Sequence, residues 1–75
     1  MNWQDYIEAK PEVAQGKPVF KGTRLTVEFI LERLGDGATV DELVQNYVGL
    51  TAEHVRAATA YAAAVLRRDE LVYSE

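Results

Sequence analysis

The side chains of this sequence that could do chemistry are few, and their scarcity limits the reactions open to it. His54 is the single histidine of the 75-residue chain, and cysteine is absent. A catalytic base needs a nucleophile or carboxylate arranged around it in a pocket, and no nucleophile motif accompanies His54. We therefore expect no catalytic residue and no enzyme activity. Disulfides and thiolate zinc sites are excluded, and we expect neither a metal nor a cofactor.

A cluster of basic residues is the first candidate for nucleic-acid contact. Lys17, Lys21 and Arg24 lie close together in the sequence with no acid among them. Such residues can face phosphates, and each contact of this kind weakens with salt. The alternative is a solvated surface, with Arg24 bracing the turn at Gly22-Thr23 by hydrogen bonds to backbone carbonyls. For Arg24 we favour that structural role.

A second candidate for DNA contact lies in the segment Thr51-Ala52-Glu53-His54-Val55-Arg56. If a helix begins here, Thr51, His54 and Arg56 occupy the positions from which a helix-turn-helix protein reaches bases or phosphates. An arginine can also bind a guanine edge through two hydrogen bonds. The alternative is an exposed helix start that Thr51 only caps, and Glu53 would repel phosphate there.

Charge and length point to a protein partner more than to DNA. Twelve acids against eight bases give a net charge of −4, whereas nucleic-acid binders usually carry a basic patch. A chain this short buries a thin core, so a second copy of the chain is the expected source of extra stability. No apolar run is long enough to span a bilayer, and the N-terminus lacks the pattern of a signal peptide. We expect a cytoplasmic homodimer with no membrane contact.

Apolar residues at the two ends of the chain are candidates for binding a partner. Trp3 and Tyr6 lie near the N-terminus, and Leu71 and Tyr73 lie in the C-terminal tail. Exposed aromatic residues commonly anchor interfaces. The alternative is that the two termini pack on each other.

Helical patterns occupy residues 26–68, and an irregular segment precedes them. Val27, Ile30, Leu31 and Leu34 share one helix face, with Thr26 as the N-cap. Strand-forming residues punctuated by glycine and proline occupy 13–25, and Lys21-Gly22-Thr23 predicts a tight turn between two short extended pieces.

Two further helices are predicted after the first. Thr39 and Glu42 form a capping box, and a short helix with Leu43, Val44 and Tyr47 on its buried stripe should follow. A longer helix should begin at Thr51. Two short helices, a turn and a longer third helix indicate a helix-turn-helix arrangement, and a plain three-helix bundle is the alternative.

The segment Gly16-Lys17-Pro18-Val19-Phe20-Lys21-Gly22-Thr23-Arg24-Leu25-Thr26-Val27 resembles the signature of the bacterial family known as domain of unknown function 433. The resemblance extends from about residue 6 to residue 64 and includes Gly37, Asn46-Tyr47, the run from Leu50 to Ala58, and Ala60-Tyr61. The sequence departs from the family pattern at Gln15-Gly16, where a pair of glycines is usual. It also departs at Thr26 and Val48, where proline is common.

This resemblance implies a mainly α fold, namely a homeodomain-like three-helix domain behind a short N-terminal β-hairpin element. We expect one domain over residues 1–75, with an extended segment at 1–25, the helical core at 26–68 and a tail at 69–75. The resemblance also implies an antitoxin-like role: members look like partners of nuclease toxins with a PIN-like fold, and such antitoxins repress their own operon by binding operator DNA. The alternative is a homodimeric protein-interaction module without DNA binding.

Overall fold

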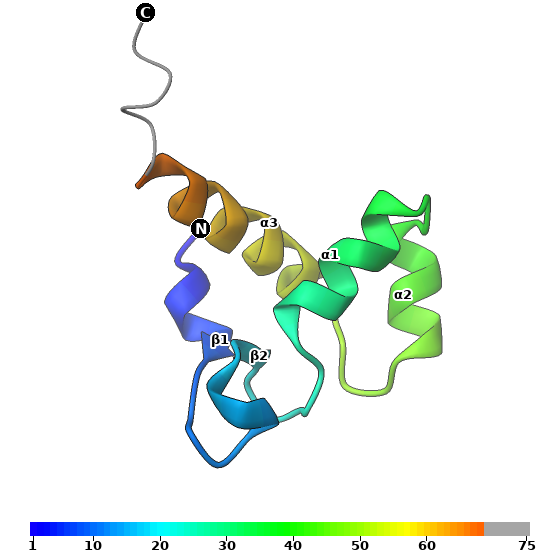
Figure 1. The fold of residues 1–75 in the computed structure, drawn as a ribbon. Helices are drawn as coiled ribbons and strands as arrows, with labels where there is room; N and C mark the ends of the chain where they lie inside the picture. The colour runs from blue at the N-terminus through cyan, green and yellow to red at the C-terminus, as the bar shows by residue number, and fades with distance from the viewer. Residues whose placement is uncertain (69–75) are drawn as a thin grey trace, which may run out of the picture.

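Three α-helices follow a short two-stranded sheet in this computed structural model, which describes residues 1–68 (Figure 1). The predicted fold class is confirmed: the chain is mainly helical, with a small antiparallel sheet near the N-terminus. In chain order the elements are the 3-10 helix η1 (Trp3–Asp5), β1 (Ile7–Glu8), the 3-10 turn η2 (Ala14–Gly16), β2 (Val19–Phe20), α1 (Val27–Gly35), α2 (Val40–Asn46) and α3 (Ala52–Arg67).

A threonine caps the N-terminus of every α-helix, as the sequence predicts. The hydroxyl oxygens of Thr26, Thr39 and Thr51 each accept a hydrogen bond from the backbone N–H three residues later. These bonds satisfy donors that the first helical turn leaves without an intrahelical partner. The capping box of α2 is complete, because the Glu42 carboxylate accepts from the Thr39 N–H at 2.8 Å.

The sheet pairs β2 with a different segment from the one expected. The sequence predicts partners on either side of the turn at Lys21-Gly22-Thr23, but β2 pairs antiparallel with β1, Ile7 opposite Phe20. The expected second piece makes only a single bridge, between Val19 and Thr26. The turn itself is present: the Thr23 N–H donates to the Phe20 carbonyl at 3.0 Å, and Gly22 has a φ of +81°.

A left-handed turn precedes β2, at the position where the sequence departs from the pattern that it resembles. Ala14, Gln15 and Gly16 have φ values of +49°, +60° and +84°. Only glycine adopts this region without a steric penalty from its side chain. The glycine pair of the resembled pattern would place a second glycine at position 15, where Gln15 holds this left-handed conformation instead.

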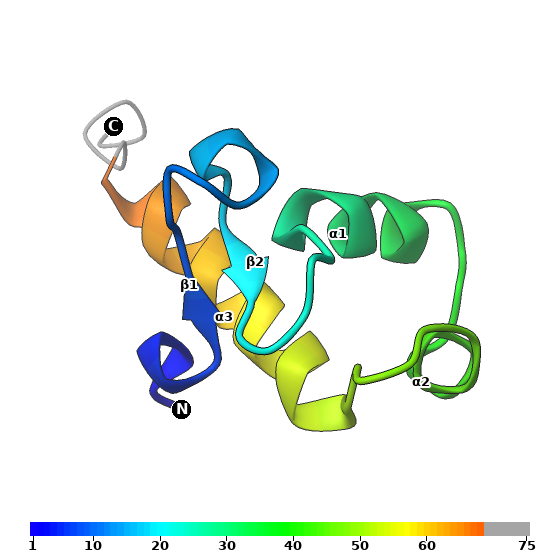
Figure 2. The same cartoon turned by 90° about the horizontal axis from the view of Figure 1, so that it is seen from below.

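Helix α3 is the element on which the others are assembled. It packs against η1, β1, α1 and α2, and the two strands lie beside its middle in two perpendicular views (Figures 1 and 2). Phe20, Ile30, Ala57 and Ala58 are fully buried. The other buried apolar residues come from the two strands, the three α-helices and the turn before α3: Ile7, Val19, Val27, Leu43, Leu50 and Val55.

Two local predictions are wrong in detail. Val44 was expected on the buried stripe of α2, but it is 36% exposed, whereas Leu43 is 2% exposed. Successive residues of a helix point about 100° apart, and this short helix lies at the edge of the fold, where only one side is covered. Near the N-terminus, the i, i+3, i+4 spacing of Trp3, Tyr6 and Ile7 predicts a single helical turn. Instead, η1 ends at Asp5 and Ile7 enters β1.

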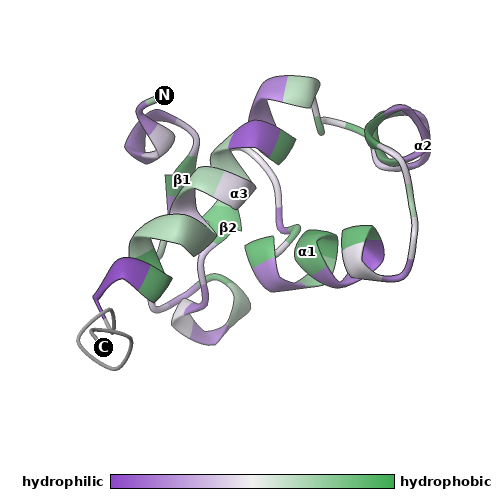
Figure 3. Ribbon diagram, turned by 90° about the horizontal axis from the view of Figure 1, so that it is seen from above, coloured by the Kyte–Doolittle hydropathy of each residue, from purple (hydrophilic) through white to green (hydrophobic). Residues whose placement is uncertain are grey.

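The hydropathy of α3 changes along its length. In Figure 3 its middle is pale green, where small apolar residues contact the rest of the fold, and its C-terminal end is purple. Leu66 interrupts this polar end and is 63% exposed.

Candidate functional site

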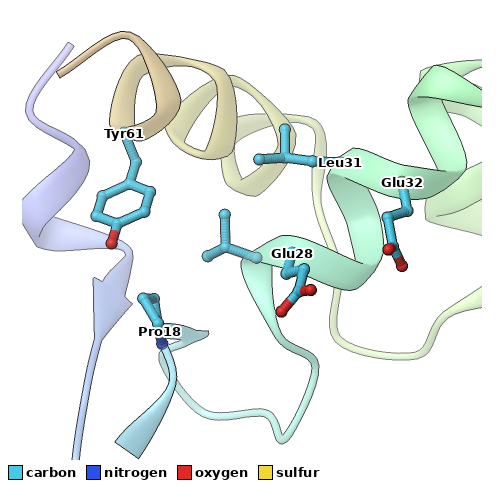
Figure 4. A pocket seen from close by; sticks show the side chains of 6 residues that line it. Pro18, Glu28, Leu31, Glu32 and Tyr61 are labelled. Carbon is cyan, nitrogen blue, oxygen red and sulfur yellow. The ribbon is translucent and has the colours of Figure 1, made fainter. Parts of the chain in front are cut away.

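A groove with an apolar floor lies between α1, α3 and the segment that enters β2 (Figure 4). It encloses about 460 Å³. Its lining consists of four apolar or aromatic residues and two acids: Pro18, Val27, Leu31, Tyr61, Glu28 and Glu32. A concave surface of this size and character is the usual form of a binding site.

The start of α1 fixes one side of the groove. The Thr26 cap begins the helix, so that Val27 and Leu31, four residues apart, lie on the same face. The Val27 N–H donates to the Pro18 carbonyl at 3.0 Å, which holds the entry to β2 beside the helix. Figure 4 shows Leu31 directed toward α3, with the carboxylates of Glu28 and Glu32 on the outer side of α1.

Tyr61 forms the opposite side of the groove. Its ring projects from α3 toward Pro18 (Figure 4). The Trp3 ring packs edge-to-face on it, with the ring centroids 4.9 Å apart. Because an aromatic pair of this geometry restricts both rings, the N-terminal segment holds Tyr61 in place.

The rim of the groove is acidic. Glu28 lies 3.4 Å from the Lys17 ammonium, and both side chains are more than half exposed, so this ion pair is weak. Glu32 makes no ion pair with a base among residues 1–68. The two carboxylates are four residues apart on one helix, where like charges repel. The groove therefore presents negative potential around an apolar floor.

The four basic residues proposed for DNA contact do not form a surface free of acids. Lys17 pairs with Glu28, and Arg56 lies 3.8 Å from the Glu53 carboxylate. Lys21 and Arg24 have no carboxylate within ion-pair distance in the described part of the chain. Among residues 1–68, two of the four predicted bases thus lie beside an acid and two do not. The expected bracing of the turn by Arg24 is also not observed there, because the Thr23 hydroxyl makes the hydrogen bonds that hold the turn, to the Phe20 carbonyl and from the Leu25 N–H.

The turn that holds Lys21 and Arg24 lies beside the turn between α2 and α3. A Cβ placed on Gly49 would be 3.4 Å from the Thr23 Cγ2 atom. Two of the predicted bases therefore lie near the start of α3, as a DNA-binding surface would require. Lys17 is directed toward α1 instead.

Thr51 and His54 hold the start of α3. The His54 Nδ1 atom accepts from the Thr51 N–H at 3.0 Å, and the Thr51 hydroxyl oxygen accepts from the His54 N–H at 3.2 Å. The imidazole also packs edge-to-face on Phe20 and on Tyr6, with centroid distances of 5.4 and 5.8 Å. The His54 side chain, which the sequence predicts to contact DNA, thus makes its contacts within the chain.

Two of the residues predicted to bind a partner pack within the chain. Trp3 and Tyr6 are half-buried against Tyr61 and His54 of α3. Both residues thus pack on α3, whereas the alternative that the two termini pack on each other also involves the C-terminal tail. The other two, Leu71 and Tyr73, lie outside the described residues.

The sequence contains one indication of the groove, although the reasoning from sequence did not identify it. The apolar face of α1 is wide: Val27 and Ile30 are buried in the core, and Leu31 is left half-buried at its edge. A surplus apolar residue flanked by Glu28 and Glu32 indicates a second surface. Pro18 and Tyr61 could not be assigned to it before the fold was known.

The described residues also form a second, smaller hollow. A smaller hollow of about 310 Å³ lies between the three helices, lined by Leu34, Val40, Ala52, Val55, Arg56 and Thr59. Within residues 1–68, no three metal-ligating side chains come together. The same part of the chain contains no helix that is both long and apolar enough to cross a membrane.

Comparison with known proteins places the chain in a family. The family model for "Protein of unknown function (DUF433)" matches residues 7–62. The uncharacterized protein y4eO of Sinorhizobium fredii is 30% identical over 61 residues, which cover 81% of this chain and 28% of that protein. This chain thus spans little more than a quarter of that relative.

A solved structure has the same fold. The crystal structure of a DUF433 member protein from Anabaena variabilis matches with a TM-score of 0.78 and 32% identity, covering 95% of this chain and 71% of that one. The family match includes Pro18, Val27, Leu31 and Tyr61, so the groove lies within the region that the family model describes. The chain belongs to the DUF433 family of proteins of unknown function.

Proposed function

We propose that this chain is an antitoxin-like protein that binds and blocks a nuclease with a PIN-like fold. The nature of the partner follows from the family resemblance. The observation that carries protein binding is the groove between α1 and α3, whose apolar floor remains accessible within the described fold. Apolar hollows of this kind, rimmed by polar groups, commonly mark surfaces that bind other molecules.

The charge of the chain supports the same partner. A nuclease surface that binds nucleic acid is basic or holds metal ions, and this chain has a net charge of −4. Opposite potentials speed the encounter of two proteins and select against partners of like charge. An acidic chain therefore suits a nuclease better than it suits the nucleic acid itself.

The experiment requires a PIN-like protein, and its source is a reading frame next to the gene for this chain, if one encodes such a protein. Titration calorimetry should detect binding to the full chain, and binding should reduce cleavage of a fluorescent RNA substrate. Leu31→Arg, which places a charge in the groove, should weaken both effects. Val44→Arg is the matched control, because Val44 is exposed on α2 and lies outside the groove. Absence of binding between the two purified wild-type proteins would contradict the proposal.

DNA binding is the second candidate function. The favouring observation is the position of Lys21 and Arg24 beside the turn between α2 and α3, where a helix-turn-helix protein meets the phosphate backbone. A titration of the DNA upstream of the gene, at low salt and with or without the nuclease, tests it. Lys21→Ala and Arg24→Ala should each reduce the salt slope by about one unit. No DNA binding in either condition would leave the homodimeric interaction module.

A further inference from the structure

We propose that the groove between α1 and α3 binds an apolar segment of a partner protein that carries lysine or arginine on its flanks. The inference deepens the proposed function, because it names the chemistry by which a nuclease or another protein would be recognised. It depends on the groove alone, so it can be tested without the nuclease.

The floor selects for apolar side chains. Val27 is buried, and Pro18, Leu31 and Tyr61 are half-buried, so each of the last three retains surface that a ligand can cover. None of these four side chains carries a charge, and the Tyr61 ring is held by Trp3 rather than free to close the groove. An occupant gains most by covering this floor with large apolar side chains.

The rim selects the charge of the occupant. Glu28 and Glu32 are exposed, lie one helical turn apart and repel each other. A lysine or arginine placed between them removes this repulsion and gains two attractive contacts at the edge of an apolar surface. The Lys17–Glu28 pair, at 3.4 Å and well exposed, is weak enough for an incoming base to replace.

Charge also disfavours the two occupants that this chain could supply, its own C-terminal tail and a second copy. The sequence of the tail, Asp69-Glu70-Leu71-Val72-Tyr73-Ser74-Glu75, surrounds an apolar triplet with acids, which the rim would repel. A second copy offers the exposed Leu66 followed by Arg67 and Arg68, but Asp69 and Glu70 come next and offset those bases. A separate partner with basic flanks fits the groove better than either.

Designed peptides provide the test. One labelled peptide has leucines at helical spacing between pairs of lysines, and its twin has glutamate in place of every lysine. Fluorescence anisotropy with the full chain at low salt should show the lysine peptide binding about tenfold more tightly than its twin. The lysine peptide should also change the emission of Trp3, the single tryptophan, because Trp3 contacts Tyr61.

Variants identify the surface that is responsible. Glu28→Gln/Glu32→Gln should abolish the preference for lysine over glutamate. The matched control Glu12→Gln/Asp41→Asn removes the same charge from exposed positions outside the groove and should retain the preference. Equal binding of the two peptides, binding of neither, or a preference that survives in Glu28→Gln/Glu32→Gln would overturn the inference.

The other occupants give different results. If a peptide of residues 69–75 binds as tightly as the lysine peptide, the tail is the occupant and the inference is wrong. If sedimentation shows a dimer that Leu31→Arg dissociates, a second copy occupies the groove and the inference is also wrong. Binding of the nuclease without binding of the lysine peptide would remove this inference and leave the proposed function. Binding of the lysine peptide without binding of the nuclease would contradict the proposed function and support this inference.

Discussion

The His54 side chain and the Thr51 backbone hold each other at the start of α3. The imidazole Nδ1 accepts from the Thr51 N–H at 3.0 Å, while the Thr51 hydroxyl oxygen accepts from the His54 N–H at 3.2 Å. This is a capping box with histidine at the position that glutamate or glutamine usually occupies. The same ring packs on Phe20, so one side chain joins the helix start to the sheet.

Replacement of His54 should therefore destabilise the fold. We expect His54→Ala to lower the free energy of unfolding by about 2 kcal/mol, since it removes both a cap and an aromatic contact. His54→Gln should cost about half as much, because glutamine can still accept from Thr51. Urea unfolding followed by Trp3 fluorescence measures both values. Thr59→Ala, at an exposed position of the same helix, is the control and should cost little.

His54 both completes the cap of α3 and packs on aromatic rings, and neither role could be predicted from the sequence. The threonine caps could be predicted because capping depends on residues three apart in the sequence. Thr51 was identified in this way, but histidine is not part of the usual capping-box pattern. Its contacts with Phe20 and Tyr6 depend on how distant segments pack, which spacing alone does not reveal.

The sheet and the groove illustrate the same limit. The turn at Gly22 could be predicted from its glycine, but the pairing of β2 with β1 joins segments separated by an irregular loop. The groove requires Pro18, Leu31 and Tyr61 from three different elements. Each of these residues alone is an ordinary apolar residue, and only the fold brings them together.

The left-handed turn before β2 predicts a stabilising substitution. Gln15 has a φ of +60°, which costs about 1–2 kcal/mol for a residue with a side chain. Glycine removes this strain but increases the entropy of the unfolded chain, which offsets about 0.4–1 kcal/mol. We expect Gln15→Gly to raise the free energy of unfolding by about 0.5 kcal/mol and Gln15→Val to lower it.

Gln45→Gly supplies the control for that comparison. Gln45 is exposed in the regular helix α2, where glycine should cost about 1 kcal/mol. Opposite signs for the two glycine substitutions in thermal unfolding are the expected result. Destabilisation by both would show that position 15 does not hold a left-handed conformation.

The glycines of the two adjoining turns should tolerate no larger side chain. Gly22 and Gly49 have φ values of +81° and +89°, and a Cβ on Gly49 would also press on Thr23. We expect Gly22→Val and Gly49→Ala each to cost more than about 1 kcal/mol. Gly35→Ala is the matched control, because Gly35 ends α1 with open space around it and should gain from helix propensity. An unchanged melting temperature for Gly22→Val would mean that Gly22 is an ordinary loop residue.

The orientation of α2 is tested by two neighbouring residues. Leu43 is 2% exposed and Val44 is 36% exposed, so only Leu43 fills the core. Leu43→Ala should lower the free energy of unfolding by about 2–4 kcal/mol, because it removes buried methyl groups and leaves a cavity. Val44→Ala should change it by less than about 0.5 kcal/mol, since alanine favours the helix and little buried surface is lost. If Leu43→Ala is too unstable to measure, Leu43→Val should still cost more than Val44→Ala in urea unfolding. Equal effects at the two positions would place Val44 on the buried face, as the sequence pattern alone suggested.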